Sequence, residues 1–125
     1  MSNYGENIVF LNGLTAGTAI SQYMVVKRSS TTDLAVLPTT ATTDVAIGIC
    51  QNDPATGEAA LVAALGEVIA LAGTSNLAVG EIVGFNSTGV IDTTTDNQRV
   101  IGQAMEASTA KSDEVRVLLS GLKRY

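Results

Sequence analysis

Two stretches of the sequence follow the same plan: "AIGICQNDPATGEAALVAALG" at residues 46–66 and "VIGQAMEASTAKSDEVRVLLSG" at residues 100–121. Each begins with apolar residues around a glycine, passes through a polar turn, and ends in a second apolar run. Short apolar runs bounded by turn residues are typical of strands in antiparallel sheets. The two stretches therefore predict a chain made of two similar β-units.

The spacing between matching residues supports a repeat. Gly48 and Gly102 lie 54 residues apart (102 − 48 = 54), whereas Met24 and Ile82, which match in an earlier block, lie 58 apart (82 − 24 = 58). The difference predicts four additional residues in the first copy (58 − 54 = 4), in the loop at residues 29–33. A longer loop there costs little, because closure entropy grows slowly with length. A glycine inside a strand marks a bend or a close backbone approach, so both glycines are expected to shape the sheet.

The chain is expected to form one domain, because its 125 residues suffice for a single hydrophobic core. Residues 1–7 are polar and predict an N-terminal arm. Residues 8–125 predict a single β domain with repeat units at about 16–66 and 74–121, joined by "EVIALAG". Two such units can bury a face against each other. We therefore predict an all-β fold, a small β-barrel or β-sandwich.

The predicted strands are rich in Val, Ile and Leu, and threonine-rich connections such as "TTATTD" and "DTTTD" separate them. The segment "GEAALVAALGEV" is rich in helix formers, but "EVRVLLSG" takes its place in the second copy and has a strand pattern. We therefore predict strand in both. The strand segments are "NIVFLNG", "YMVVKR", "LAVLP", "VAIGICQ", "ALVAALG", "EVIALAG", "EIVGFN", "GVIDTT", "VIGQAME" and "EVRVLLSG".

Charge is scarce in this chain. Charged residues make up 15% of it, against about 25% in an average globular protein, and aromatic residues make up 4%. So sparse a charge favours a surface that is covered, through oligomerisation or docking on a larger body. The net charge is −5, and the seven Lys and Arg residues are scattered. Nucleic-acid binding needs clustered positive charge, so we predict no nucleic-acid partner.

No segment is expected to enter a membrane. The longest apolar run, residues 59–65, is far shorter than the roughly 20 residues that a membrane-spanning helix needs. The start, "MSNYGENIVF", lacks the basic and apolar segments of a signal peptide. We therefore expect a protein that is made in a cytoplasm and has no membrane partner.

Catalytic groups are also scarce. The chain has no histidine, which removes the usual general base and the commonest metal ligand. Cys50 is the only cysteine, so no internal disulfide can form, and its apolar neighbours Ile47 and Ile49 predict burial. The serines lie in turns without a G-x-S-x-G frame, and the glycines form no phosphate-binding motif.

Two carboxylate pairs are close in sequence, Asp92 with Asp96 and Asp113 with Glu114. Both pairs lie in polar loop sequence, where solvated carboxylates are the usual finding. The segment "DTTTDN" lacks the ligand spacing of a calcium-binding EF-hand loop. We therefore predict that the chain is not an enzyme and holds no cofactor or metal.

The two ends differ from the strands between them. The head, "MSNYGEN", is polar and carries Tyr4, an amphipathic side chain suited to interfaces. The tail, "GLKRY", places Lys123, Arg124 and Tyr125 where an acidic partner could contact them. For both ends the alternative is a solvated terminus without contacts.

The order of the apolar segments resembles a known family. Residues 77–121, with "VGE-IV", "VIG-A-EA" and "VRVLL-G", are similar to the C-terminal half of the capsid cement proteins of tailed bacteriophages, also called head decoration proteins. Residues 47–73 are similar to the middle section of that family. The resemblance covers residues 16–121 and departs from the family at residues 111–112, where a glycine turn like that at Gly57 is expected.

The resemblance implies a structural virion protein on the outer surface of a mature capsid. Such proteins sit at junctions between major capsid subunits after the shell expands, and they resist the pressure of packaged DNA. It further implies a homo-oligomer, a trimer in the common case, with a dimer as the alternative. In lambda-type decoration proteins an N-terminal arm orders on docking and adds to a capsid sheet. The corresponding arm here consists of Ser2, Asn3, Tyr4, Gly5, Glu6 and Asn7.

A second hypothesis is a carbohydrate-binding or adhesion β-module displayed on a virion. Such modules stack sugars on exposed aromatic rings, so the few aromatic residues of the chain decide between the hypotheses. The aromatic residues are Tyr4, Phe10, Tyr23, Phe85 and Tyr125. Glycan binding that disappears on mutation of Tyr23 or Phe85 would favour this hypothesis.

Overall fold

The computed structural model describes residues 8–92 and 99–124, with side chains up to residue 120. All regular structure in these ranges is β-strand, which confirms the all-β prediction. The strands are β1 (Val9–Leu11), β2 (Thr15–Ala16), β3 (Val25–Arg28), β4 (Ala35–Pro38), β5 (Ala46–Cys50), β6 (Val62–Leu71), β7 (Ile82–Phe85), β8 (Val90–Asp92), β9 (Arg99–Ala104) and β10 (Glu114–Arg124).

The strands form one sheet in the order β2-β4-β3-β5-β6-β10-β9-β7-β8, and β1 also pairs with β6. The pairs are antiparallel, except that β2 and β4 are parallel. Since β2 and β8 stand at opposite ends of this order, the sheet is not closed into a barrel. A closed barrel, one of the two predicted architectures, is therefore not what the chain forms.

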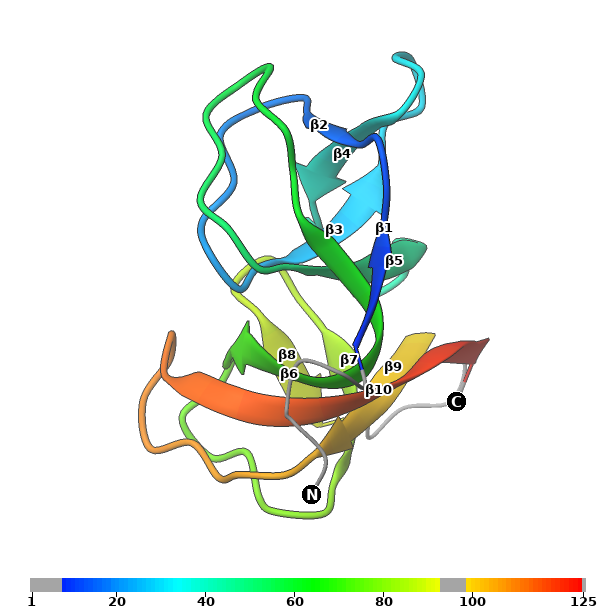
Figure 1. The fold of residues 1–125 in the computed structure, drawn as a ribbon. Coiled ribbons are helices and arrows are strands. Elements are labelled where there is room, and N and C mark those ends of the chain that lie inside the picture. Colours follow the sequence, from blue (N-terminus) through cyan, green and yellow to red (C-terminus); the bar gives the residue numbers. More distant parts are fainter. Residues whose placement is uncertain (1–7, 93–98, 125) are drawn as a thin grey trace, which may run out of the picture.

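Two runs of four strands have the same order, β4-β3-β5-β6 and β8-β7-β9-β10. We call β1–β5 with Val62–Leu65 the first unit, and Gly66–Leu71 with β7–β10 the second unit. Figure 1 shows the first unit in the upper half of the molecule and the second in the lower half. That residues 16–66 and 74–121 are repeat copies, and residues 1–7 an arm, stays a prediction.

The two units share strand β6. Val62 and Ala63 pair with β5 of the first unit, whereas the residues from Gly66 onward pair with β10 of the second. The sequence predicted two strands here, with "EVIALAG" as a linker, but the structure has one continuous strand. Gly66 has a φ of +107°, a conformation that side chains disfavour, at the point where β6 passes between the units.

Strand register revises the spacing of the predicted repeat. Val26 pairs opposite Gly48, and Val83 pairs opposite Gly102. The valines lie 57 residues apart (83 − 26 = 57) rather than the predicted 58, so the longer hairpin of the first unit has three additional residues rather than four (57 − 54 = 3). The sequence match was one residue out of register, because adjacent Val, Ile and Met letters match equally well.

Both repeated glycines permit close approach of the backbones. A Cβ at Gly48 would collide with the carbonyl oxygen of Ala63, and one at Gly102 would collide with that of Leu118. Each carbonyl belongs to the strand that follows in its unit, β6 or β10. The expectation that these two glycines shape the sheet is therefore confirmed.

The hydrophobic core forms two clusters. Alternate residues of the first unit enter different clusters: Val25 belongs to the larger cluster, whereas Val26 belongs to the smaller one. The larger cluster also contains the second unit's inner face, including Val117 and Leu119. The smaller cluster is completed by the segment before β3, with Ile20. Both faces of the first unit are therefore covered, one of them by the second unit.

Four turns share one hydrogen-bonding arrangement, "ATTD" at 41–44, "ATGE" at 55–58, "AVGE" at 78–81 and "AKSD" at 110–113. In each, the N–H of the alanine donates to the carboxylate of the acidic residue. The N–H of the acidic residue donates to the alanine carbonyl. Ser112 has a φ of +69° and takes the place of the expected glycine, so this turn forms without one.

Replacing Gly102 tests the close approach of β9 and β10. Gly102→Ala is expected to lower the free energy of unfolding by about 1–3 kcal/mol, because its Cβ meets the rigid backbone of Leu118. Gly17→Ala is the matched control, since its Cβ meets the movable end of the Leu37 side chain. Urea denaturation measures both, and equal stability losses would contradict the argument.

The turn before β5 is expected to make stability depend on pH. Burial alone raises the pKa of the Asp44 carboxyl, but backbone N–H groups of Thr40 and Ala41 and the Lys27 ammonium at 3.2 Å bring it below its ordinary value. Such a carboxyl stabilises the fold above its unfolded pKa, and the contribution is lost as the pH falls through the folded pKa.

Asp44→Asn is therefore expected to lower the free energy of unfolding by about 1 kcal/mol at neutral pH. The difference from wild type should shrink below roughly pH 3, where the wild-type carboxyl also becomes protonated. Urea denaturation across this pH range measures the effect, with Asp33→Asn as the charge-matched control. A constant difference at every pH would contradict the assignment.

Candidate docking surfaces

The groups considered for chemistry are dispersed in the fold. Within residues 8–92 and 99–124, no group of three His, Cys, Asp or Glu residues could hold a metal ion. Asp92 ends β8, and its predicted neighbour Asp96 lies outside the described residues. Asp113 closes a turn, while Glu114 begins β10. These carboxylates therefore form no catalytic pair in the part of the chain that the structure describes.

Cys50 is fully buried, as the sequence predicted. Burial raises the pKa of its thiol, and its Sγ donates to Oδ1 of Asn52 at 3.2 Å. The buried Ser108 receives a hydrogen bond from the Leu77 N–H and donates one to the Thr74 carbonyl. Both side chains therefore have packing and hydrogen-bonding roles. The described part of the chain contains no helix long and apolar enough to span a bilayer.

Surface apolar residues gather in two places that matter for docking. One is around β1, where the exposed Val9 pairs opposite the exposed Leu65 and is followed by Phe10. β1 has β6 as its one strand neighbour among the described residues. A short strand with one paired edge can accept another strand along its free edge. The predicted arm precedes this strand directly in the sequence.

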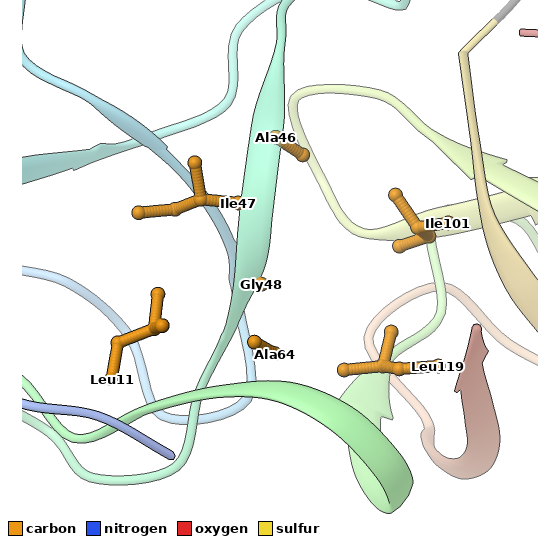
Figure 2. A pocket seen from close by; sticks show the side chains of 7 residues that line it. All are labelled: Leu11, Ala46, Ile47, Gly48, Ala64, Ile101 and Leu119. Carbon is orange, nitrogen blue, oxygen red and sulfur yellow. The ribbon is translucent and has the colours of Figure 1, made fainter. Parts of the chain in front are cut away.

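An apolar cavity of about 360 Å³ lies where the two units meet. Figure 2 shows Leu11 and Ile47 on one side of β5, and Ala46, Ile101 and Leu119 on the other. Gly48 and Ala64 complete the lining, so every lining residue is apolar or glycine. Small-molecule sites place a few polar groups to orient a ligand, and this lining has no polar side chain. The cavity therefore suits packing better than substrate binding.

The second place is the outer face of the second unit. Ile82 of β7 pairs opposite Gln103 of β9, which pairs opposite Leu118 of β10, and Leu118 pairs opposite Glu67 of β6. We call these four residues the outer row. Ile82 is 50% exposed and Leu118 is 40% exposed. A hollow of about 240 Å³ beside Gly102 is lined by both side chains.

The charged groups on this face compensate each other. Arg116 Nη1 lies 3.4 Å from Glu67 Oε1, and the backbone N–H of Arg116 donates to the Glu106 carboxylate at 2.8 Å. Gln103 is held by a hydrogen bond from its Nε2 to the Gly80 carbonyl. The outer face therefore combines large apolar side chains with a locally neutral charge distribution.

The residues predicted for docking fall largely outside this description. Ser2 to Asn7 and Tyr125 are not among the described residues. Lys123 and Arg124 belong to β10, where they pair opposite Val100 and Arg99, so they are part of the sheet rather than a solvated tail. The sequence missed the outer row, because only the register shows which strand residues share an exposed face.

The aromatic residues bear on the carbohydrate-binding hypothesis. Phe85 is 1% exposed and belongs to the larger core cluster, so its ring cannot stack on a sugar. Tyr23 is half-buried in a turn with a φ of +72°. The role suggested for Phe85 is therefore wrong. The physical reason is that β7 points this side chain toward the core, which the sequence pattern alone did not resolve.

Comparisons with known proteins agree with this architecture. The chain resembles the crystal structure of the head fiber gp8.5 N base in bacteriophage phi29, with a TM-score of 0.71 and 18% identity, covering 90% of this chain and 94% of that one. At this identity the likeness shows the fold alone. No curated protein matches the chain. A family model described as phage cement protein matches residues 5–119, which is most of the sequence. The chain therefore belongs to the phage cement protein family.

Proposed function

We propose that this structural phage protein docks on the outer surface of a mature capsid, at junctions between major capsid subunits, and stabilises the shell against the pressure of packaged DNA. The observation that carries the proposal is the family match over residues 5–119. The structure supports it with exposed apolar surfaces on an all-β scaffold and with dispersed carboxylates that form no catalytic pair in the described residues. A rigid scaffold of this kind acts by binding, so no enzymatic step is part of the proposal.

The N-terminal arm, Ser2 to Asn7, is the proposed capsid contact. An extended segment can add to the edge of a capsid sheet through main-chain hydrogen bonds, which require no conspicuous side-chain motif. Ordering such a segment costs about 1–2 kcal/mol per residue, so one arm alone binds weakly. The arm enters the fold at β1, whose pairing with β6 anchors it to the sheet.

Self-association makes weak arms effective. When several arms belong to one oligomer, the second and third contacts become intramolecular, and avidity can rise by roughly 10²–10⁴. We propose a homo-oligomer, as a trimer or a dimer, with the major capsid protein as partner. The C-terminal residues Lys123, Arg124 and Tyr125 are a second proposed contact.

Removing the arm should separate folding from docking. Deletion of residues 2–7 is expected to leave a folded oligomer that no longer co-sediments with expanded heads, because the described core starts at Ile8. Circular dichroism and sedimentation velocity verify the fold and the oligomer. A variant with the same six positions replaced by Gly and Ser is the length-matched control, and it should bind as weakly as the deletion. Full binding by either variant would remove the arm from the mechanism.

The maturation state of the capsid provides the second test. Wild-type protein is expected to bind expanded heads saturably and to ignore unexpanded procapsids, because junctions between subunits change when the shell expands. Co-sedimentation with both particles from the parent phage measures this difference. Equal binding to procapsids would show that the site exists before maturation, and binding to neither would contradict the proposed function.

A further inference from the structure

The two units treat the same strand positions differently. In the first unit, Val25 pairs opposite Ile49, and Ile49 pairs opposite Ala63. This row has the same place relative to Gly48 as the outer-row residues Ile82, Gln103 and Leu118 have relative to Gly102. The three first-unit residues are 0% exposed, whereas their second-unit counterparts are on the surface.

What covers the row in the first unit is a sheet of the same chain. Val25, Ile49 and Ala63 belong to the larger core cluster, together with Val117 and Leu119 of β10. Ile101 and Leu119 also line the cavity beside Gly48. The row in the first unit is therefore packed by apolar side chains from neighbouring strands of the second unit.

In the second unit the corresponding row keeps large apolar side chains but lies open. Ile82 and Leu118 flank the hollow beside Gly102, just as apolar residues line the cavity beside Gly48. Met105, also exposed, follows β9 on the same side of the unit, where its N–H donates to the Arg116 carbonyl. Contiguous exposed apolar side chains on a soluble protein mark an interaction site.

Charge selects the kind of partner. Each copy of the chain carries a net charge of −5, so two copies repel each other over most of their surfaces. The outer face is a place where this repulsion is small, because Arg116 compensates Glu67 beside the apolar residues. A locally neutral apolar face between two acidic molecules is suited to self-association.

We propose that the outer face of the second unit, centred on Ile82 and Leu118, is the surface through which copies of this chain associate. The proposal rests on the function proposed above, in which the cement protein acts as an oligomer. In the oligomer, an apolar face of another copy covers the outer row, as the second unit covers the matching row of the first. The Gln103 amide lies between the two apolar side chains and orients the contact through its remaining hydrogen-bonding capacity.

The test replaces the two apolar residues together, as Ile82→Lys with Leu118→Lys. Lysine lowers the net negative charge, so weaker association cannot be attributed to added repulsion, and at position 118 it lies opposite Glu67. The dissociation constant from sedimentation equilibrium is expected to rise about a hundredfold or more, as for buried interface anchors. Val45→Lys is the matched control: Val45 is 48% exposed in the first unit, and its variant should associate like wild type.

A second pair, Ile82→Thr with Leu118→Thr, keeps strand-forming β-branched residues and serves if the lysine variant fails to fold. A wild-type chain that stays monomeric at high concentration would overturn the proposal. So would variants whose dissociation constant stays within about threefold of wild type, a difference too small for an interface anchor.

Head binding distinguishes this proposal from the function it rests on. If wild type forms the oligomer through this face but binds no heads, the cement function fails and the surface assignment stands. If the Ile82 and Leu118 variants keep the oligomer but lose head binding, the face contacts the capsid protein, and the self-association proposal is overturned. Monomeric variants with weakened head binding support both.

Discussion

The pairing of β6 with strands of both units is the constraint on which the rest of the structure depends. Its first residues hydrogen-bond to β1 and β5, and its later residues to β10. Because one strand supplies hydrogen bonds to both units, neither unit can complete its sheet without the other. The larger core cluster adds to this dependence, since it contains Val25 and Val117 from different units. The strand ladder and the core therefore unite the chain in a single cooperative body.

Sharing β6 also leaves the two units with unequal surroundings. The first unit has the second on one face and the segment around Ile20 on the other. The second unit has a covered inner face, but its outer face carries Ile82 and Leu118 at the surface. Similar strand orders thus produce different surfaces, because covering one row in the molecule leaves its counterpart open. That inequality creates a surface for association without any catalytic group.

The composition suits a structural role. The core is made mostly of Val, Ala, Ile and Leu, with Phe85 as its largest fully buried side chain. Small side chains allow strands to approach closely, as at Gly48 and Gly102, where no Cβ would fit. The acid-closed turns satisfy backbone N–H groups without glycine in every case, as Ser112 demonstrates. These features produce a compact scaffold whose contacts with other molecules lie at its surface.

The sequence by itself determined the local elements. Apolar runs predicted nearly all the strands, the setting of Cys50 predicted its burial, and matching words indicated the phage cement family. Strand formation follows from side chains near in sequence, so a single chain pattern can reveal it. Only the tertiary structure decided that β6 is continuous, that the sheet stays open, that Phe85 is buried and that Ile82 is exposed. Those outcomes depend on register and on which face another layer covers, and both are set by residues distant in sequence.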